Sequence, residues 1–141
     1  MREIKFRGKR IDNGEWVYGF IVRTKDGSFI CYDGQYDDDL FISPENILIP
    51  VNPETVGQFT GLRDKNGTEI YDDDITKYSY ISPMDGMEKF YIWVVAIKNG
   101  MYWLKHIGEK KHYDSSLYLK FTQIEVIGNI HENPSLLEVS R

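Results

Sequence analysis

The sequence predicts an all-β protein, on three observations. Six of its twelve glycines directly follow Asn or Asp, and such pairs favour tight hairpin turns because both residue types tolerate positive φ. The segments between these pairs are rich in Val, Ile, Tyr, Phe and Trp, which suit a pleated, half-buried surface. No sustained 3.6-residue apolar period occurs, apart from a candidate turn at residues 114–119. Many short strands with closely spaced turn signals are typical of a sandwich or barrel.

An N-terminal β-meander subdomain is expected over residues 1–53. Its strands are predicted at residues 4–10, 15–23 and 28–32, joined by the turns at residues 12–14 and 25–27. Residues 41–49 contain Ser43-Pro44, which predicts a broken or edge segment because proline cannot donate to a sheet ladder. Pro50 and Pro53 mark the expected boundary of this subdomain.

A small SH3-like β-barrel is expected over residues 54–132, with the chain ending in a helical turn and tail at 133–141. Its strands are predicted at residues 55–60, 75–81, 89–98, 101–107 and 124–130. Asn99-Gly100 closes the clearest hairpin, whose first strand is apolar on both faces and is therefore expected at the centre of the core. Asn133 and Pro134 are expected as the N-cap and first residue of the terminal turn.

The charge of the chain is unevenly distributed. The net charge of −5 argues against a general nucleic-acid coat, which needs a basic surface. Residues 1–25 carry seven basic and three acidic side chains, a net +4, and residues 26–85 carry three basic and thirteen acidic, a net −10. The remaining residues, 86–141, carry seven basic and six acidic, a net +1. We expect the acidic residues to lie in solvated loops that keep the protein soluble.

The sequence also indicates a compartment. Cys31 is the single cysteine, so no internal disulfide can form, and a buried, inert thiol is expected in its strand. The first residues are charged where a signal peptide would be apolar, and the longest apolar run, residues 90–97, is far shorter than the ~20 residues of a membrane helix. We therefore expect a soluble, cytoplasmic protein with no membrane partner.

Two stretches carry a resemblance to a known family. The first motif, residues 56–75, reads VGQFTGLRDKNGTEIYDDDI, and the second motif, residues 125–134, reads EVIGNIHENP. Together with the opening segments 6–9 (FRGK) and 16–19 (WVYG), they resemble the YopX family of phage and prophage proteins. The resemblance implies an all-β, barrel-bearing fold, a phage or prophage origin within a bacterial host, and an undefined molecular function.

One departure from the family pattern concerns backbone geometry. Where the family usually has Glu-Gly-Asp, this chain has Asp72-Asp73-Asp74. Either the turn does not require positive φ at Asp73, or aspartate tolerates it there at modest cost. A structural and a binding role both stay open for the motif positions, which are Gly57, Thr60, Gly61, Asp64, Asn66, Gly67, Tyr71, Asp74, Gly128, Asn129, Asn133 and Pro134.

The carboxylate clusters favour turns over metal sites. Residues 64–69 fail the calcium-loop pattern, because counting from Asp64 places glycine at the fourth position and isoleucine at the twelfth. Asp64 is therefore expected to bond backbone amides across a turn. Three consecutive aspartates in a strand alternate between faces, so Asp74 is expected to fix a turn, with a weak divalent-metal site at residues 72–74 as the alternative. Residues 37–39, also all Asp, are expected to form a solvated loop.

The inventory for catalysis is thin. The three histidines, His106, His112 and His131, stand at no metal-ligand spacing to one another or to the cysteine, and no phosphate-binding glycine loop is present. We therefore expect no enzyme and no cofactor.

A binding role is the expectation that remains. Aromatic residues make up 14% of the chain, more than a core of this size requires. An aromatic and lysine face on the barrel could stack single-stranded nucleic acid, with the alternative that its aromatics are core and rim residues. The candidates for that face are Tyr91, Tyr102, Trp103, Lys105, Lys110 and Lys111. A protein partner or self-association is favoured, and nucleic-acid binding or an acidic decoy that mimics DNA are the rival hypotheses.

Overall fold

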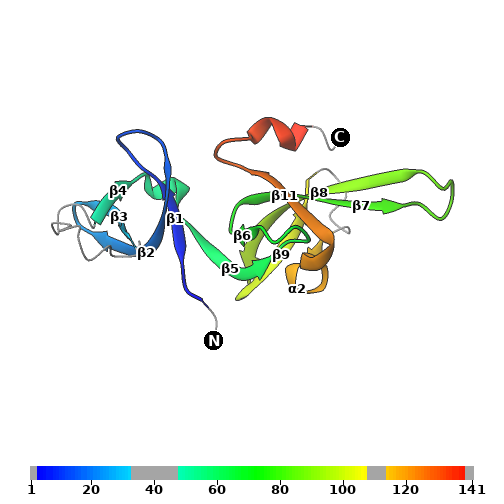
Figure 1. The fold of residues 1–141 in the computed structure, drawn as a ribbon, viewed down its shortest axis with the longest axis horizontal. Coiled ribbons are helices and arrows are strands. Elements are labelled where there is room, and N and C mark those ends of the chain that lie inside the picture. Colours follow the sequence, from blue (N-terminus) through cyan, green and yellow to red (C-terminus); the bar gives the residue numbers. More distant parts are fainter. Residues whose placement is uncertain (1–2, 33–47, 108–113, 139–141) are drawn as a thin grey trace. The chain divides into compact units, whose positions relative to one another are not determined.

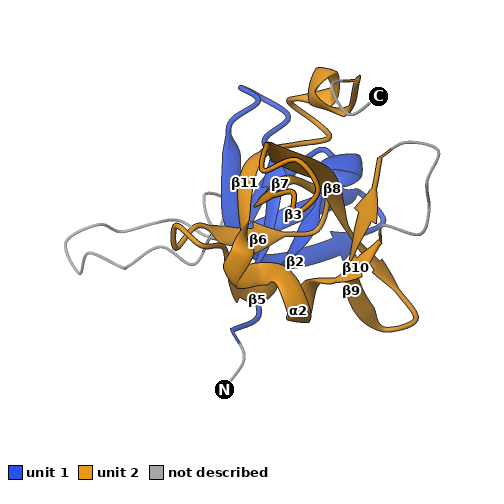
Figure 2. Cartoon of the chain, turned by 90° about the vertical axis from the view of Figure 1, so that its right-hand side faces the viewer, with its two compact units in different colours: residues 1–59 blue, residues 60–141 orange. Residues whose placement is uncertain are grey.

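The structure, a computed structural model, describes residues 3–32, 48–107 and 114–138. The all-β prediction is confirmed, since the described chain forms two antiparallel sheets with only short helical turns (Figure 1). The chain divides into two compact units, residues 1–59 and 60–141 (Figure 2). The division lies inside strand β5 (Gly57–Arg63), a few residues beyond the proline-marked boundary that the sequence suggested.

The predicted N-terminal meander is present in unit 1. Its strands are β1 (Phe6–Lys9), β2 (Trp16–Thr24), β3 (Gly27–Tyr32) and β4 (Leu48–Val51), followed by the 3-10 helix η1 (Pro53–Thr55). Within the first sheet the strand order is β4-β3-β2-β1-β5-β6, so β1, β2 and β3 pair consecutively. Gly14 closes the first hairpin at φ 72°, which glycine adopts without steric cost. Residues 41–47 of the predicted segment 41–49 lie outside the described residues, and its last two residues belong to β4.

Packing in unit 1 centres on the completely buried Ile30 and Val51. A Cβ at Gly8 would lie 3.1 Å from the side chain of Val51, so glycine lets β1 approach that residue closely. Cys31 is half-buried rather than buried, which corrects the expectation for its thiol. The alternation of β3 places Cys31 on the face opposite to Ile30.

Unit 2 contains the longest described strand, β8 (Glu88–Lys98), which has 11 residues. Its elements are β6 (Glu69–Tyr71), β7 (Asp74–Ile81), β8 (Glu88–Lys98), β9 (Met101–His106), β10 (Ser115–Ser116), α2 (Leu117–Lys120), η3 (Phe121–Gln123), β11 (Ile124–Asn129) and η4 (Pro134–Glu138). Its sheet has the order β10-β9-β8-β7-β11. The order is open among the described residues, so the predicted SH3-like barrel stays a prediction. The short strand β6 lies inside the first motif and was not expected.

The core of unit 2 is built around β8, as the sequence predicted. Its buried residues come from five segments of the chain and are Ile70, Trp93, Val95, Tyr102, Leu104, Leu117 and Ile124. The β8–β9 hairpin turns at Asn99 and Gly100 with φ of 54° and 76°, so the predicted turn is confirmed. No helix among the described residues is long and apolar enough to cross a membrane.

Candidate functional site

The first motif forms a turn organised by the carboxylate of Asp64. This residue is only 6% exposed and follows directly after β5. One carboxylate oxygen accepts hydrogen bonds from the backbone N–H groups of Asn66 (2.8 Å) and Thr68 (2.9 Å). The other accepts one from the N–H of Val126 on β11 (2.8 Å). The turn predicted for Asp64 is confirmed, and the same side chain also ties that turn to a strand of the second motif.

Backbone contacts reinforce this connection. The N–H of Asp64 donates to the carbonyl of Thr68, and the N–H of Gly67 donates to the carbonyl of Asp64. Gly67 adopts φ 82°, so the reversal predicted at Asn66-Gly67 is present. The N–H of Lys65 reaches the Ile124 carbonyl at 3.1 Å. Because both oxygens of the Asp64 carboxylate accept hydrogen bonds from backbone N–H groups, this side chain has a structural role.

The second turn of the motif depends on Asp74. Asp74 is 1% exposed, and its carboxylate accepts a hydrogen bond from the N–H of Tyr71 at 2.7 Å. This bond spans the turn that connects β6 to β7. Asp73 adopts φ 69°, so the question raised by the missing glycine is answered: the turn requires positive φ and aspartate accepts it. The N–H of Asp73 also donates to the Val95 carbonyl, and its own carbonyl accepts from Ile130.

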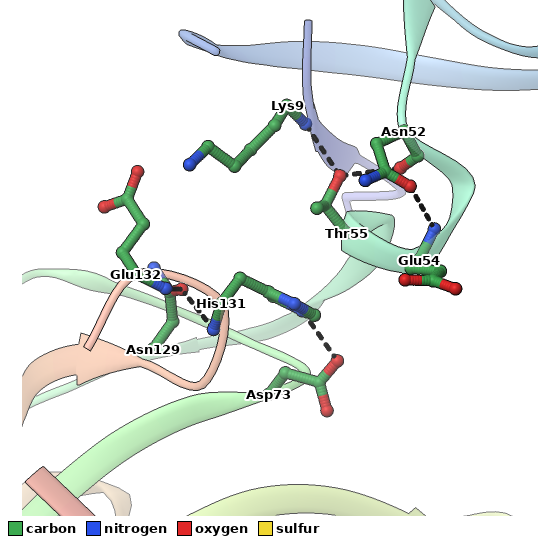
Figure 3. A network of polar contacts seen from close by, with 8 residues as sticks. All are labelled: Lys9, Asn52, Glu54, Thr55, Asp73, Asn129, His131 and Glu132. Atoms are coloured by element: carbon green, nitrogen blue, oxygen red, sulfur yellow. Dashed lines mark hydrogen bonds and ion pairs between the residues drawn. The ribbon is translucent and has the colours of Figure 1, made fainter. Parts of the chain in front are cut away.

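Asp73 also brings a carboxylate against a histidine of the second motif. Its Oδ2 lies 3.2 Å from Nε2 of His131, and Figure 3 shows the ring directed at the carboxylate. The two side chains are 29% and 17% exposed, respectively. Asn129 holds the histidine backbone, because its Oδ1 accepts from the N–H groups of His131 and Glu132, both at 3.0 Å. The sequence reasoning missed this pair, since the two residues are 58 positions apart and only the pairing of β7 with β11 brings their segments together.

The second motif is held by its asparagines. Asn133 Oδ1 accepts from the N–H of Asn129 at 3.2 Å, and the Asn133 N–H donates to the Asn129 carbonyl at 2.9 Å. A Cβ at Gly128 would stand 2.5 Å from Asn133 Oδ1, so this glycine is required by close approach. Pro134 begins η4, which confirms the predicted terminal turn. Asn133 stands directly before that helix, as predicted for the N-cap, and its carbonyl accepts from the N–H of Leu136 at 3.0 Å, while its side chain braces the preceding chain.

The remaining motif residues also contribute to architecture. Thr60 is 1% exposed, its hydroxyl donates to the Ile70 carbonyl at 2.8 Å, and it accepts from the N–H of Leu62 at 3.2 Å. Gly61 has φ 86° within β5, and Tyr71 is 2% exposed. Gly57 is a buried residue paired with Arg7 of β1. The motifs therefore build turns and strand junctions.

The predicted aromatic and lysine face does not form one surface. Strand register places Tyr91 and Tyr102 on the face of the sheet that carries the core, and Tyr102 is 6% exposed. Trp103 and Lys105 alternate onto the opposite face, where the Trp103 indole N–H donates to the Lys98 carbonyl at 3.2 Å. Lys110 and Lys111 lie outside the described residues, as do His112 and the acidic residues 37–39.

The described residues contain no group of three or more His, Cys, Asp and Glu side chains arranged to hold a metal ion. His106 meets the ring of Tyr91 edge-on at 5.8 Å, and its backbone N–H donates to Asp114. A cavity of about 460 Å³ in unit 1 is lined by Lys9, Arg10, Ile11, Gly14, Asn52 and Pro53. The Asp12 carboxylate, in a bidentate hydrogen bond with Arg10, raises the pKa of that guanidinium, while Arg10 lowers the pKa of Asp12.

These observations define a class of protein: a mainly β chain in two units, whose sequence motifs form turns and strand junctions. The chain matches the family model described as YopX protein over residues 5–138, and it therefore belongs to the YopX family. Among solved structures it is similar to protein EF1440 from Enterococcus faecalis, at 23% identity over 97% of this chain and 99% of that chain, with a TM-score of 0.49. No curated protein matches it.

Replacing Asp64 by asparagine is expected to destabilise unit 2. The amide has one accepting oxygen, so its NH₂ group would face a backbone N–H that the carboxylate now binds. We expect a loss of about 2–4 kcal/mol in the free energy of unfolding, since hydrogen bonds to charged groups contribute ~1.5–3 kcal/mol each. Denaturant titration measures this. Glu88→Gln, at an exposed position of β8, is the matched control, and an Asp64→Asn variant as stable as that control would refute the structural role.

The backbone at Asp73 gives a second prediction. Alanine at φ 69° is strained by ~1–2 kcal/mol, whereas glycine is not strained there and loses only ~0.5–1 kcal/mol of chain entropy. Both variants lack the contact with His131, so their difference isolates the backbone. We expect Asp73→Gly to unfold at a higher temperature than Asp73→Ala, and the reverse order would show that the turn does not hold positive φ in solution.

Proposed function

We propose that this YopX-family chain is a phage- or prophage-encoded, non-enzymatic accessory protein that acts through protein contacts, made by a hairpin arm of unit 2. The arm is the outer part of the β7–β8 hairpin, residues 79–90. Its two strands pair from Ile75 opposite Val94 to Ile81 opposite Glu88. Strand β9 pairs with β8 only at residues 93–98, and β11 pairs with β7 only at residues 74–78. Figure 1 shows β7 and β8 extending beyond the neighbouring strands of unit 2.

The arm ends in exposed apolar side chains. The exposed fractions are 65% for Ile81, 92% for Met84, 64% for Met87 and 43% for Phe90. Several large apolar side chains exposed along one short segment are typical of protein-interaction sites, and methionine side chains adapt to a partner's shape because they are flexible and polarizable. This exposed tip is the single observation that carries the proposal.

Hydrogen bonds order the turn at the tip. The N–H of Ser82 donates to the Met87 carbonyl at 2.9 Å, and the N–H of Gly86 donates to the Ser82 carbonyl at 2.9 Å. The Met87 N–H donates to Asp85, and this bond, followed by the ion pair with Lys89, lowers the pKa of the Asp85 carboxyl. Because the pKa of Asp85 is lower in the folded turn than in the unfolded chain, its ionised carboxylate stabilises the turn at pH values above the unfolded-state pKa. This stabilisation is lost as the pH falls through the folded-state pKa.

Stacked aromatic rings stiffen the arm behind its tip. Tyr78, Tyr80 and Tyr91 stack on one face with centroid separations of 5.3–6.2 Å, and Trp93 continues the stack into the core. The hydroxyls of Tyr80 and Tyr91 lie 3.3 Å apart, and the ammonium of Lys120 lies 5.0 Å above the ring of Tyr78. Cross-strand aromatic pairs of this kind stabilise a two-stranded ribbon that would otherwise be marginal in water. A stiff arm presents its tip with little loss of entropy on binding.

Self-association is the first form of contact to test. Beyond Tyr78 the described part of β11 no longer pairs with β7, so the backbone of the arm offers an edge to a strand from a second copy. The basic first 25 residues and the acidic segment 26–85 also allow opposite charges of two copies to meet.

The test replaces the tip by Met84→Ser/Met87→Ser, with Leu119→Ser as the matched control, since Leu119 is 72% exposed on α2. Sedimentation velocity over a range of concentrations is expected to show a concentration-dependent oligomer for the parent chain and the control. The tip variant is expected to dissociate at least ~10-fold more readily, because a buried methionine contributes ~1.5–3 kcal/mol.

A parent chain that is strictly monomeric moves the test to a heterologous partner. Affinity capture from host lysate would then compare the same three chains by quantitative mass spectrometry. Partners retained by the parent and Leu119→Ser chains but lost by the tip variant support the arm. Equal capture by all three chains, together with a monomeric parent, would contradict the proposal.

A further inference from the structure

Unit 1 carries a second surface of different chemistry. Trp16, Tyr18 and Phe20 alternate along β2 and therefore point to one face of the sheet. Lys5, Arg7 and Lys9 alternate in the same way along β1 and the residue that precedes it. Arg7 pairs with Tyr18 and Lys9 with Trp16, so an aromatic row and a cationic row lie side by side. We call these six residues the β1–β2 face.

The core of unit 1 lies on the other side of this sheet. The residues that alternate with the β1–β2 face include Gly8, where a Cβ would lie 3.1 Å from the Val51 side chain, and Gly19, which is buried. Ile21 on the same side pairs with the completely buried Ile30. The β1–β2 face is therefore not required to form the core of unit 1.

Cations lie over aromatic rings on this face. The guanidinium of Arg7 lies 4.8 Å from the ring centroid of Trp16, and the ammonium of Lys9 lies 5.9 Å from it. Lys5 lies 5.2 Å above the ring of Phe59 and 3.6 Å from the carboxylate of Glu3. Arg7 is 7% exposed, so its guanidinium serves to fix the ring of Trp16. Such contacts set the orientation of a ring while keeping positive charge beside it.

Two rings of the aromatic row are open to solvent. Tyr18 is 44% exposed and Phe20 is 50% exposed. Alternate residues on a strand are separated by about 6.6 Å, so the rings and the lysines repeat at a regular spacing along this face. Exposed rings can stack on bases, and lysines beside them can neutralise phosphates.

We propose that the β1–β2 face binds single-stranded nucleic acid, with bases stacked on Tyr18 and Phe20 and phosphates placed along Lys5 and Lys9. Single strands are favoured over duplex because the flat rings need unpaired base faces. Stacking of this kind is tolerant of sequence, so no base preference is expected. The net charge of +4 over residues 1–25 favours approach of phosphates to this unit, although the chain as a whole is acidic.

The experiment measures fluorescence anisotropy of labelled oligo(dT) and oligo(rU) at low ionic strength with the full chain. The parent chain is expected to bind at least one of the two, and more tightly than a duplex of the same length. Tyr18→Ala/Phe20→Ala is expected to raise Kd by about 10-fold or more, given the contribution of stacking per base. Lys9→Gln is expected to reduce the slope of log Kd against log salt by about 0.7, the value for one phosphate contact on a single strand.

Phe90→Ala is the matched control, because Phe90 is also an exposed ring (43%) with a lysine, Lys77, 4.8 Å above it, but it belongs to the arm of unit 2. Its Kd is expected to equal that of the parent chain, which separates this site from the protein contacts of the arm. Thermal unfolding checks that the variants fold, and Tyr18→Leu/Phe20→Leu keeps apolar bulk if the alanine variant does not. No binding at low salt, equal affinity for duplex, or equal loss in Phe90→Ala would overturn the proposal.

Discussion

The folded form of unit 2 depends on the buried carboxylate of Asp64. Three backbone N–H groups converge on it, two from its own turn and one from Val126, which lies 62 positions further along the chain. A buried carboxylate is costly unless its oxygens are hydrogen-bonded, so the surrounding backbone must hold these donors in place. Because Asp64 directly follows β5, it also fixes where that strand ends and where β11 attaches. In the next turn, the buried carboxylate of Asp74 likewise accepts a hydrogen bond from a backbone N–H group, that of Tyr71.

The two long motifs, residues 56–75 and 125–134, do not contribute to the surfaces proposed to bind partners, whereas most of the β1–β2 face lies in the opening family segments 6–9 and 16–19. The motif side chains that hydrogen-bond backbone groups include Thr60, Asp64, Asp74 and Asn129, all of which are buried. The arm of residues 79–90 and the β1–β2 face lie outside the two motifs. Asp64 and Asp74 therefore contribute to the net charge of the chain without adding to an acidic surface, since they are 6% and 1% exposed. An acidic decoy would have to rely on other carboxylates.

Local signals were readable from the sequence, and contacts between distant segments were not. Asn99-Gly100 and Asn66-Gly67 specify their turns through their own φ preferences, and Asp64 was recognisable as a turn residue. The Asp73–His131 pair requires the register of β7 against β11, which no local pattern encodes. The predicted aromatic and lysine face was wrong as a single surface because Tyr102 and Trp103 are adjacent and must point to opposite faces. The same alternation rule could have found Trp16, Tyr18 and Phe20.

Amide hydrogen exchange at Asn66, Thr68 and Val126 tests most directly whether Asp64 organises the fold. Because one carboxylate binds all three N–H groups, the account predicts that they share a high protection level and exchange only when unit 2 unfolds. The amide of Gly86, in the turn of the arm, provides the comparison for a hydrogen-bonded but exposed turn. Exchange at Asn66 and Thr68 as fast as at Gly86, with Val126 still protected, would contradict the account, since the turn would then open independently of β11.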